Sequence, residues 1–237
     1  MAGTVVHLSV AVMLNSMIQA EPERYLGKFA SEYQAELFFG GNISPDGIMA
    51  RKNYERSMKL HTHMRDGILD GTFHEPSNLR IFRRRLYEFY KENLNNPDRD
   101  FSLYLGYLTH MLTDEKFVLE IYNDVLEAIA KAGYPRMDRE TFEKFGADVD
   151  SVDFRLVREF PGISTARDAL RNVKPYEIAG MITEQELTDS RNWILKYFFD
   201  QERVEIKEPV FLSYKRIQSF IDDAADEIIT RLPEYLF

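Results

Sequence analysis

The sequence predicts an all-α fold, arranged as a single multi-helix bundle. Across 237 residues, apolar side chains recur at steps of three and four, whereas alternation of apolar and polar residues is hard to find. A hydrophobic fraction of 44% is enough for a sizeable core, which excludes a disordered or fibrous chain. The chain has no internal repeat, low-complexity stretch or evident linker. We therefore expect one helical domain over residues 1–237.

The first half of the chain predicts helices separated by one glycine-rich loop. A helix is expected over residues 7–18, and a second over 22–37, because proline at position 22 is well placed in a first turn. Three glycines and a proline in residues 38–47 predict an ordered loop there. Further helices are expected over 54–69 and 78–94.

The central part should contain one long helix and then shorter pieces. Asn95-Asn96-Pro97 is expected to end the preceding helix, and the next one should run over 101–132 until Gly133 and Pro135. Residues 138–171 predict short helical pieces, with breaks at Gly146 and at Pro161-Gly162.

The last third shows clearer signals. Thr183, followed three residues later by Glu186, predicts a capping box that begins a helix extending through residue 199. Residues 203–211 are expected to be extended, and a final amphipathic helix should begin near Ser213. Its inward stripe comprises Ile217, Phe220, Ile221, Ala224, Ile228 and Leu232. The aromatic group at 193–199 indicates core or a partner interface.

Charge and residue usage exclude several classes of function. The chain has 30 basic and 39 acidic side chains, a net charge of −9, so a large nucleic-acid interface is not expected. The most apolar stretch, residues 5–18, is interrupted by polar side chains and has no basic residue before it, which predicts neither a membrane span nor a signal peptide. We expect a cytoplasmic protein. Because the chain has no Cys and five His, any zinc site must use imidazole nitrogen and carboxylate oxygen.

The sharpest candidate is the pair His110 and Asp114 in the predicted helix 101–132. Four residues apart, they lie on one helical face, where both can bind one ion. That face is otherwise apolar, and a buried carboxylate must be paired or bound to metal. The alternative is a hydrogen bond inside a helical core. Gly106, one turn earlier, leaves space for another helix or a ligand.

The other candidates are Asp46 in the glycine-rich segment and the remaining histidines. Asp46 could equally be a helix cap or an Asx turn. His61 and His63 point about 200° apart on a helix, so at most one of them can bind a given metal. His74 precedes a proline in a polar turn and is expected in solvent. His7 could be a core residue or a ligand.

In this order, the features resemble the zinc-dependent phospholipase C family of bacteria, whose all-α fold is shared with certain single-strand nucleases. The resemblance rests on four motifs in the first 125 residues or so. These are His7 in Val-Val-His-Leu, Asp46 in Gly-Gly-Asn-Ile-Ser-Pro-Asp, His63 in Thr-His-Met-Arg-Asp, and His110 with Asp114 in Leu-Gly-Tyr-Leu-Thr-His-Met-Leu-Thr-Asp. His63 is preferred to His61 because of its Thr-His-Met context.

The resemblance implies a metal site of Asp46, His63, His110 and Asp114, and a second shared through Asp114 with His7. The chain has no His beyond position 110, so the family's three-metal cluster is not expected. Two imidazoles and two carboxylates suit one or two zinc ions, and would also accept manganese or iron(II). Metal-bound water would be the nucleophile toward a small phosphoester or phospholipid head group, with Asp46 as base.

This implied function is a metal-dependent hydrolase of phosphoric esters. Tyr107 or Arg65 would contact substrate or orient a ligand. The helices of residues 1–132 would supply the metal site, and residues 133–237 would add helices without an assigned role. The alternative is a catalytically inactive helical protein with the same fold that acts as a binding or assembly module.

Overall fold

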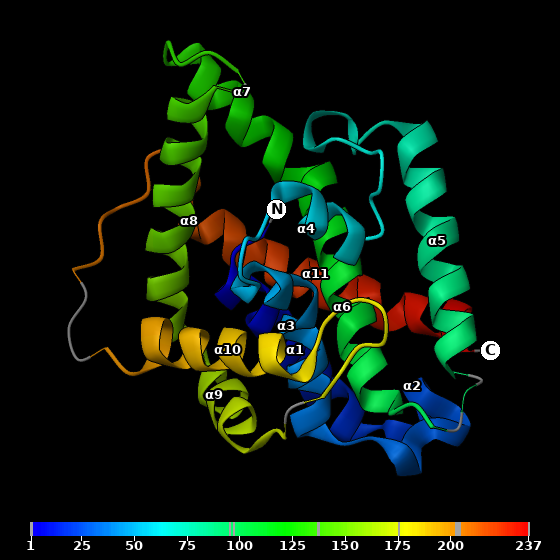
Figure 1. Ribbon diagram of the computed structural model, residues 1–237. Coiled ribbons are helices and arrows are strands. Elements are labelled where there is room, and N and C mark those ends of the chain that lie inside the picture. The colour runs from blue at the N-terminus through cyan, green and yellow to red at the C-terminus, as the bar shows by residue number, and fades with distance from the viewer. Residues whose placement is uncertain are drawn as a thin grey trace.

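The computed structural model describes residues 2–94, 96, 98–136, 138–174, 176–201 and 205–236. Within these residues the regular structure is helical, without a β-strand, and only an isolated bridge joins Ile178 to Ile182 (Figure 1). The predicted all-α class is confirmed.

The helices follow one another with short connections. They are α1 Thr4–Ala20, α2 Pro22–Leu26, α3 Ala35–Gly47, α4 Arg56–Thr62, α5 Pro76–Leu94, α6 Phe101–Phe117, α7 Asn123–Lys131, α8 Arg139–Glu159, α9 Ile163–Asn172, α10 Glu184–Ile194 and α11 Tyr214–Leu236. Helices α6 and α7 are joined by a π-helical segment, Val118–Tyr122, and α10 continues into another, Leu195–Phe199.

Helices α3 and α6 form the centre of the molecule and pack closely along their length. Helix α1 lies against both of them and also contacts α8, α9 and α11, while α10 lies across α3 (Figure 1). Buried apolar side chains from Val5 to Leu236 form one contiguous core. The chain's N-terminal helices are therefore covered by helices from its C-terminal half.

The expected loop over residues 38–47 is wrong, because this segment belongs to helix α3. Its glycines serve close packing instead of a turn. A Cβ atom on Gly41 would lie 1.8 Å from the carbonyl oxygen of Leu103 in α6, and one on Gly106 would lie 1.9 Å from that of Phe38 in α3. Only glycine permits this crossing. Of the two uses proposed for Gly106, space for another helix is the one observed.

The helix expected over 22–37 is also interrupted. Helix α2 ends at Leu26, and Gly27 takes a positive φ of 53° before a 3₁₀ segment, Gly27–Glu32. Gln34 is extended and precedes α3. Because Gly adopts positive φ without a steric penalty, the break occurs at the residue that tolerates it best.

The helix expected over 54–69 ends early, at Thr62. The backbone N–H of Arg65 donates to the Leu60 carbonyl at 2.8 Å and that of Met64 donates to the His61 carbonyl at 3.0 Å, which together form a Schellman motif. Met64 takes the left-handed position, with φ of 55°, where glycine is usual. The sequence therefore carries no glycine to mark this helix end.

The other predicted elements agree with the structure more closely. Helix α5, the long α6–α7 helix, the break at Pro161-Gly162, the Thr183–Glu186 capping box and the buried stripe of α11 are confirmed. Helix α8 runs unbroken through Gly146, so the break predicted there is wrong. Asn95 and Pro97 in one predicted boundary, and residues 203 and 204 of the predicted extended segment, lie outside the described residues.

Among the described helices, none combines the length and the apolar character needed to cross a bilayer. The cytoplasmic location stays a prediction.

Arg65 is completely buried and depends on one carboxylate. Its Nη1 lies 2.6 Å from Oδ1 of Asp70, which also contacts Arg56. Burial acts to raise the pKa of Asp70, but Arg65 and Arg56 together lower it to about 2 from an ordinary value of 3.8. This bond engages one guanidinium nitrogen of Arg65, whereas Nε and Nη2 are buried without a hydrogen-bond partner among the described residues. The expected contact of Arg65 with substrate or with a ligand stays a prediction.

The Asp70 pairing predicts a pH-dependent contribution to stability. Because the folded-state pKa is depressed, the contribution of about 2 kcal/mol is present at neutral pH and is lost as the pH falls from about 4 toward 2. We expect Asp70→Asn to lower the free energy of unfolding by about that amount at pH 7. Urea unfolding of both proteins as a function of pH measures the difference, which should shrink in acid. A pH-independent difference would contradict this explanation.

Candidate metal centre

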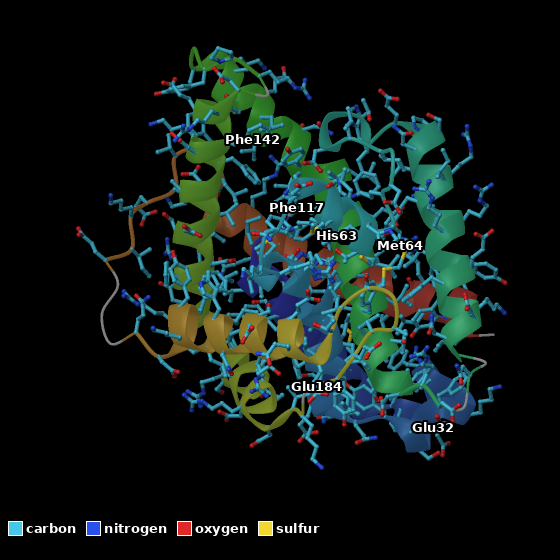
Figure 2. All side chains as sticks on the ribbon, in the orientation of Figure 1. Glu32, His63, Met64, Phe117, Phe142 and Glu184 are labelled. Carbon is cyan, nitrogen blue, oxygen red and sulfur yellow. The ribbon has the colours of Figure 1, made fainter. Side chains whose placement is uncertain are left out.

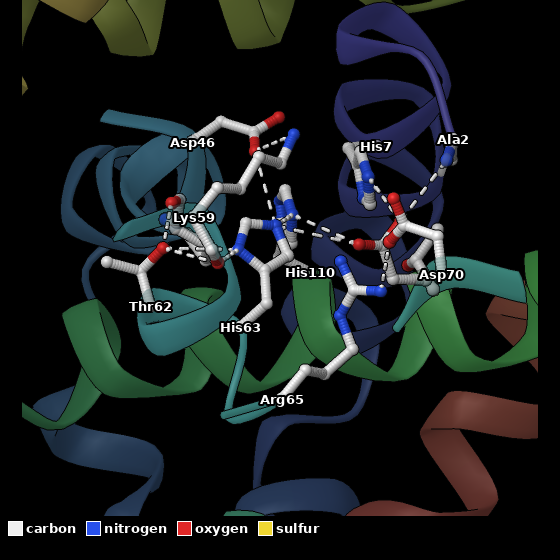
Figure 3. Close-up of polar contacts among 12 residues, drawn as sticks. Ala2, His7, Asp46, Lys59, Thr62, His63, Arg65, Asp70 and His110 are labelled. Atoms are coloured by element: carbon white, nitrogen blue, oxygen red, sulfur yellow. Dashed lines mark hydrogen bonds and ion pairs between the residues drawn. The ribbon is translucent and has the colours of Figure 1, made fainter. Parts of the chain in front are cut away.

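Four segments of the chain bring the five predicted ligands to one buried place. Figure 3 shows His7, Asp46, His63 and His110 of this group. His7 comes from α1, Asp46 from the last turn of α3, His63 from the residue that ends α4, and His110 with Asp114 from α6. Asp46 has a side-chain exposure of 19%, whereas the other four are almost fully buried. His63 lies near the middle of the molecule (Figure 2).

The hydrogen bonds of His63 and His110 fix the tautomer of each ring. Nδ1 of His63 lies 2.8 Å from the carbonyl oxygen of Lys59, and Nδ1 of His110 lies 2.8 Å from that of Asn42. A carbonyl only accepts hydrogen bonds, so each Nδ1 must carry the proton. In the neutral rings, both Nε2 atoms then present lone pairs, and these atoms are 3.3 Å apart. Two facing lone pairs repel each other, and a cation bound between the two Nε2 atoms would remove that repulsion.

Two carboxylate oxygens face the same point. Oδ1 of Asp46 lies 3.2 Å from Nε2 of His63, and Oδ2 of Asp114 lies 3.6 Å from that atom and 3.8 Å from Nε2 of His110. Ligand atoms about 2.0–2.1 Å from a tetrahedral zinc lie about 3.3–3.4 Å from one another. The observed separations are close to that spacing. Within the described part of the chain, Asp114 Oδ2 is buried without a hydrogen-bond partner.

The donor atoms fall into two groups of three that share His110. One group is His7, His110 and Asp114, and the other is Asp46, His63 and His110, with the donor atoms of each group within 4.8 Å of one another. His7 Nε2 lies 3.3 Å from Asp114 Oδ1, and its ring stacks on that of His110 at 3.7 Å. The sequence predicted a second site that shares Asp114 with the first. In the structure, His110 belongs to both donor groups.

Burial and charge favour the protonation states that a metal requires. Burial lowers the pKa of His63, and lowers that of His110 well below its ordinary value. Burial acts to raise the pKa of Asp46, but Lys59 and His63 outweigh it and keep the pKa well below the usual range. The pKa of Asp114 is likewise lowered, because the contacts with His7 and His110 outweigh burial. Neutral imidazoles and ionised carboxylates are the ligand forms of these groups.

The remaining sequence candidates lie away from the cluster. His61 is half-exposed and pairs with Asp66, Nδ1 to Oδ2, at 2.8 Å, so the preference for His63 agrees with the geometry. His74 does not join the donor groups of the described residues. Tyr107 donates to the carbonyl of Thr62, which fixes the backbone beside His63. The Tyr107 hydroxyl therefore contacts the backbone next to a candidate ligand, which agrees with the expected role of orienting a ligand; that role stays a prediction.

The sequence interpretation gave no role to two buried polar residues at this centre. Lys59 Nζ lies 2.6 Å from Asp46 Oδ1, the oxygen that also faces His63. The Lys59 side chain is 9% exposed. Both amide atoms of Asn42 are buried without a hydrogen-bond partner among the described residues. Helical spacing could have pointed to both residues, because Lys59 precedes His63 by four residues and Asn42 precedes Asp46 by four.

The Lys59 ammonium competes with a metal cation for Asp46. Because the two positive charges repel each other at a buried site, we expect Lys59→Met to tighten zinc binding by about tenfold or more. Lys52→Met is the matched control, since Lys52 is exposed, and it should leave the affinity unchanged. Competitive titration with a chromophoric chelator measures both. Weaker binding by Lys59→Met would show that Lys59 instead orients Asp46 for the ion.

Comparison with known proteins identifies no relative: no protein-family model, curated protein or solved structure matches the chain. The resemblance to zinc-dependent phospholipase C therefore stays a prediction that rests on the four motifs.

Proposed function

We propose that this chain is a divalent-metal-dependent hydrolase of phosphoric esters, a phospholipase C-like phosphodiesterase. The observation that carries the proposal is a buried cluster of imidazole nitrogens and carboxylate oxygens that forms two groups of three donors sharing His110. Nε2 of His63, Nε2 of His110 and Oδ2 of Asp114 lie 3.3–3.8 Å apart, and Oδ1 of Asp46 lies 3.2 Å from Nε2 of His63, so these four residues would hold one ion and His7 would complete a second position. This nitrogen and oxygen set suits zinc, and it also accepts manganese or iron(II).

A cavity gives substrate access to this centre. It has a volume of about 370 Å³ and is lined by His7, Asp46 and His110 on one side and by helix α10 on the other. A bound divalent cation would activate water and polarise a phosphoryl oxygen. Asp46 lines the cavity and is the more exposed carboxylate, so it is the one placed to accept a proton as base.

The groups around the cavity favour an anionic substrate. Asn42 lines the cavity, and its unpartnered amide can donate a hydrogen bond to a phosphoryl oxygen. Lys59 does not line the cavity, but its ammonium adds a positive charge behind Asp46. Lys59 also helps to keep Asp46 ionised, the form in which a carboxylate binds a cation.

The test combines metal analysis with phosphodiester assays. We expect zinc-supplemented protein to retain close to one or two equivalents of metal, and to hydrolyse bis(4-nitrophenyl) phosphate or 4-nitrophenyl phosphorylcholine in a chelator-sensitive manner. His110→Ala should lower the rate by more than about 100-fold. His61→Ala, which changes an exposed histidine, should not lower it.

The outcomes separate the alternatives. Bound metal without cleavage of any phosphoric ester, including single-stranded nucleic acid, would favour the inactive binding or assembly module. Less than about 0.2 equivalents of metal would contradict the centre itself, because a site with this many ligands should bind far more tightly than micromolar.

A further inference from the structure

The cavity beside the donor cluster is lined by two chemically different groups of residues. His7, Asn42 and His110 are polar and buried and form what we call the inner end, whereas Met49 and Trp193 are apolar and about half exposed and form the outer end. The other lining residues are Thr4, Ile43, Asp46, Ala50, Asp189, Ser190 and Ile194. A ligand that fills it must therefore have one polar and one apolar part.

Trp193 is the principal feature of the outer end. Its side chain was expected in the core or at a partner interface, but it is 48% exposed and lines the cavity. The indole stacks on the ring of Tyr197, with centroids 4.9 Å apart and planes 11° from parallel, so its orientation is fixed before a ligand arrives. Met49 also lines the cavity and is exposed to a similar extent, 47%. Two exposed apolar side chains at one cavity favour burial by an apolar ligand group.

Asn42 marks the inner end. The residue is fully buried, and neither side-chain amide atom has a partner among the described residues. Leaving such a group unsatisfied costs about 1–3 kcal/mol, and a ligand that accepts its hydrogen bond recovers part of that cost. Its backbone carbonyl accepts from His110, which fixes Asn42 directly beside the cluster.

We propose that this cavity is a specificity subsite for a flat, uncharged apolar group, such as an aryl ring, carried by the phosphoric ester. The ring would lie against Trp193 and Met49, and the amide of Asn42 would contact the phosphoryl end. This inference rests on the proposed function for the phosphoryl part only. Asp189 lines the same cavity and accepts a hydrogen bond from Gln185 at 2.9 Å, so a cationic substituent paired with Asp189 is the competing occupant that the test must separate.

Phosphonates that cannot be hydrolysed test the subsite without turnover. Phenylphosphonate, methylphosphonate and 2-aminoethylphosphonate are titrated into the zinc-loaded protein by calorimetry. We expect phenylphosphonate to bind about tenfold or more tightly than the other two. Because the chain contains a single tryptophan, its fluorescence reports on the cavity directly, and phenylphosphonate should change it most.

Two variants and a control locate the effect. Trp193→Leu should remove most of the preference for phenylphosphonate, and Ala50→Phe, which narrows the cavity at an exposed position, should do the same. Phe142→Ala is the control, because Phe142 is an exposed aromatic residue on α8, at the opposite end of the molecule from α10 (Figure 2). It should leave the preference intact.

The results distinguish failure of the subsite from failure of the proposed function. Equal binding of phenylphosphonate and methylphosphonate would overturn the apolar subsite and leave the hydrolase proposal standing. Tighter binding of 2-aminoethylphosphonate would overturn it in favour of a cationic substituent. If no phosphonate binds but phenol changes the Trp193 fluorescence, the subsite stands and the phosphoryl chemistry fails. If phenol also has no effect, both are overturned.

Discussion

Asp114→Asn is expected to abolish stable metal binding. Oδ2 of Asp114 faces Nε2 of both His63 and His110, and Oδ1 contacts His7 and accepts from the backbone N–H of Ala2 at 3.2 Å. An amide at this position removes a negative charge and places either a weak ligand or an N–H donor toward the ion. Changing a residue that only hydrogen-bonds to a metal ligand typically lowers metal affinity by about 10–100-fold. Loss of a ligand itself should therefore lower zinc affinity by more than about 100-fold.

Asp66→Asn provides the matched control. Asp66 also pairs with a histidine, His61, but both side chains are more than half exposed. We expect this variant to bind zinc as the wild type does when both are measured by chelator competition. Equal loss in the two variants would indicate a general effect on folding, and equal retention would show that Asp114 is not a ligand.

Gly106→Ala is expected to destabilise the fold severely, by more than about 4 kcal/mol. The new Cβ would lie 1.9 Å from the Phe38 carbonyl oxygen and 2.7 Å from the backbone nitrogen of Asn42. Both are backbone atoms, so neither can move without separating α3 from α6. Since Asp46 lies on α3 and His110 on α6, the same displacement should also lower zinc affinity.

Gly146→Ala is the control for helix propensity. Gly146 lies within α8, and a Cβ there meets nothing within 4 Å. Alanine should therefore stabilise the protein by about 0.5–1 kcal/mol. Urea unfolding compares the two variants with the wild type. Similar stability of Gly106→Ala and Gly146→Ala would contradict the close crossing of α3 and α6.

The glycines explain why the local structure around the candidate site was not predicted correctly from the sequence. Gly40, Gly41 and Gly47 were interpreted as turn residues, which is one of the two uses of glycine. The other use, close approach of two backbones, applies to Gly41, and it leaves no local signal because it depends on Leu103 in α6, more than fifty residues away. Asp46 was still a candidate ligand, because a carboxylate can bind a cation whether it lies in a loop or in a helix.

His110 and Asp114 could be predicted because both lie on one helix, where spacing alone determines which side chains share a face. The end of α4 could not be predicted, because Met64 adopts the left-handed conformation at a position where glycine usually marks the end of a helix. The sequence also did not show that helix α10 lines the cavity. Trp193 lies on an amphipathic helix with aromatic neighbours, and only tertiary packing places it beside a cavity shared with His7.

The most direct test of the metal centre is an anomalous difference map at the zinc absorption edge, calculated from crystals of the zinc-supplemented protein. We expect a peak about 2.0–2.1 Å from Nε2 of His63 and from Nε2 of His110, with carboxylate oxygens of Asp46 and Asp114 also within bonding distance. A second, adjacent peak beside His7 would correspond to the second position. A map without a peak between the two imidazoles, in a protein that is otherwise folded as described, would contradict the central claim.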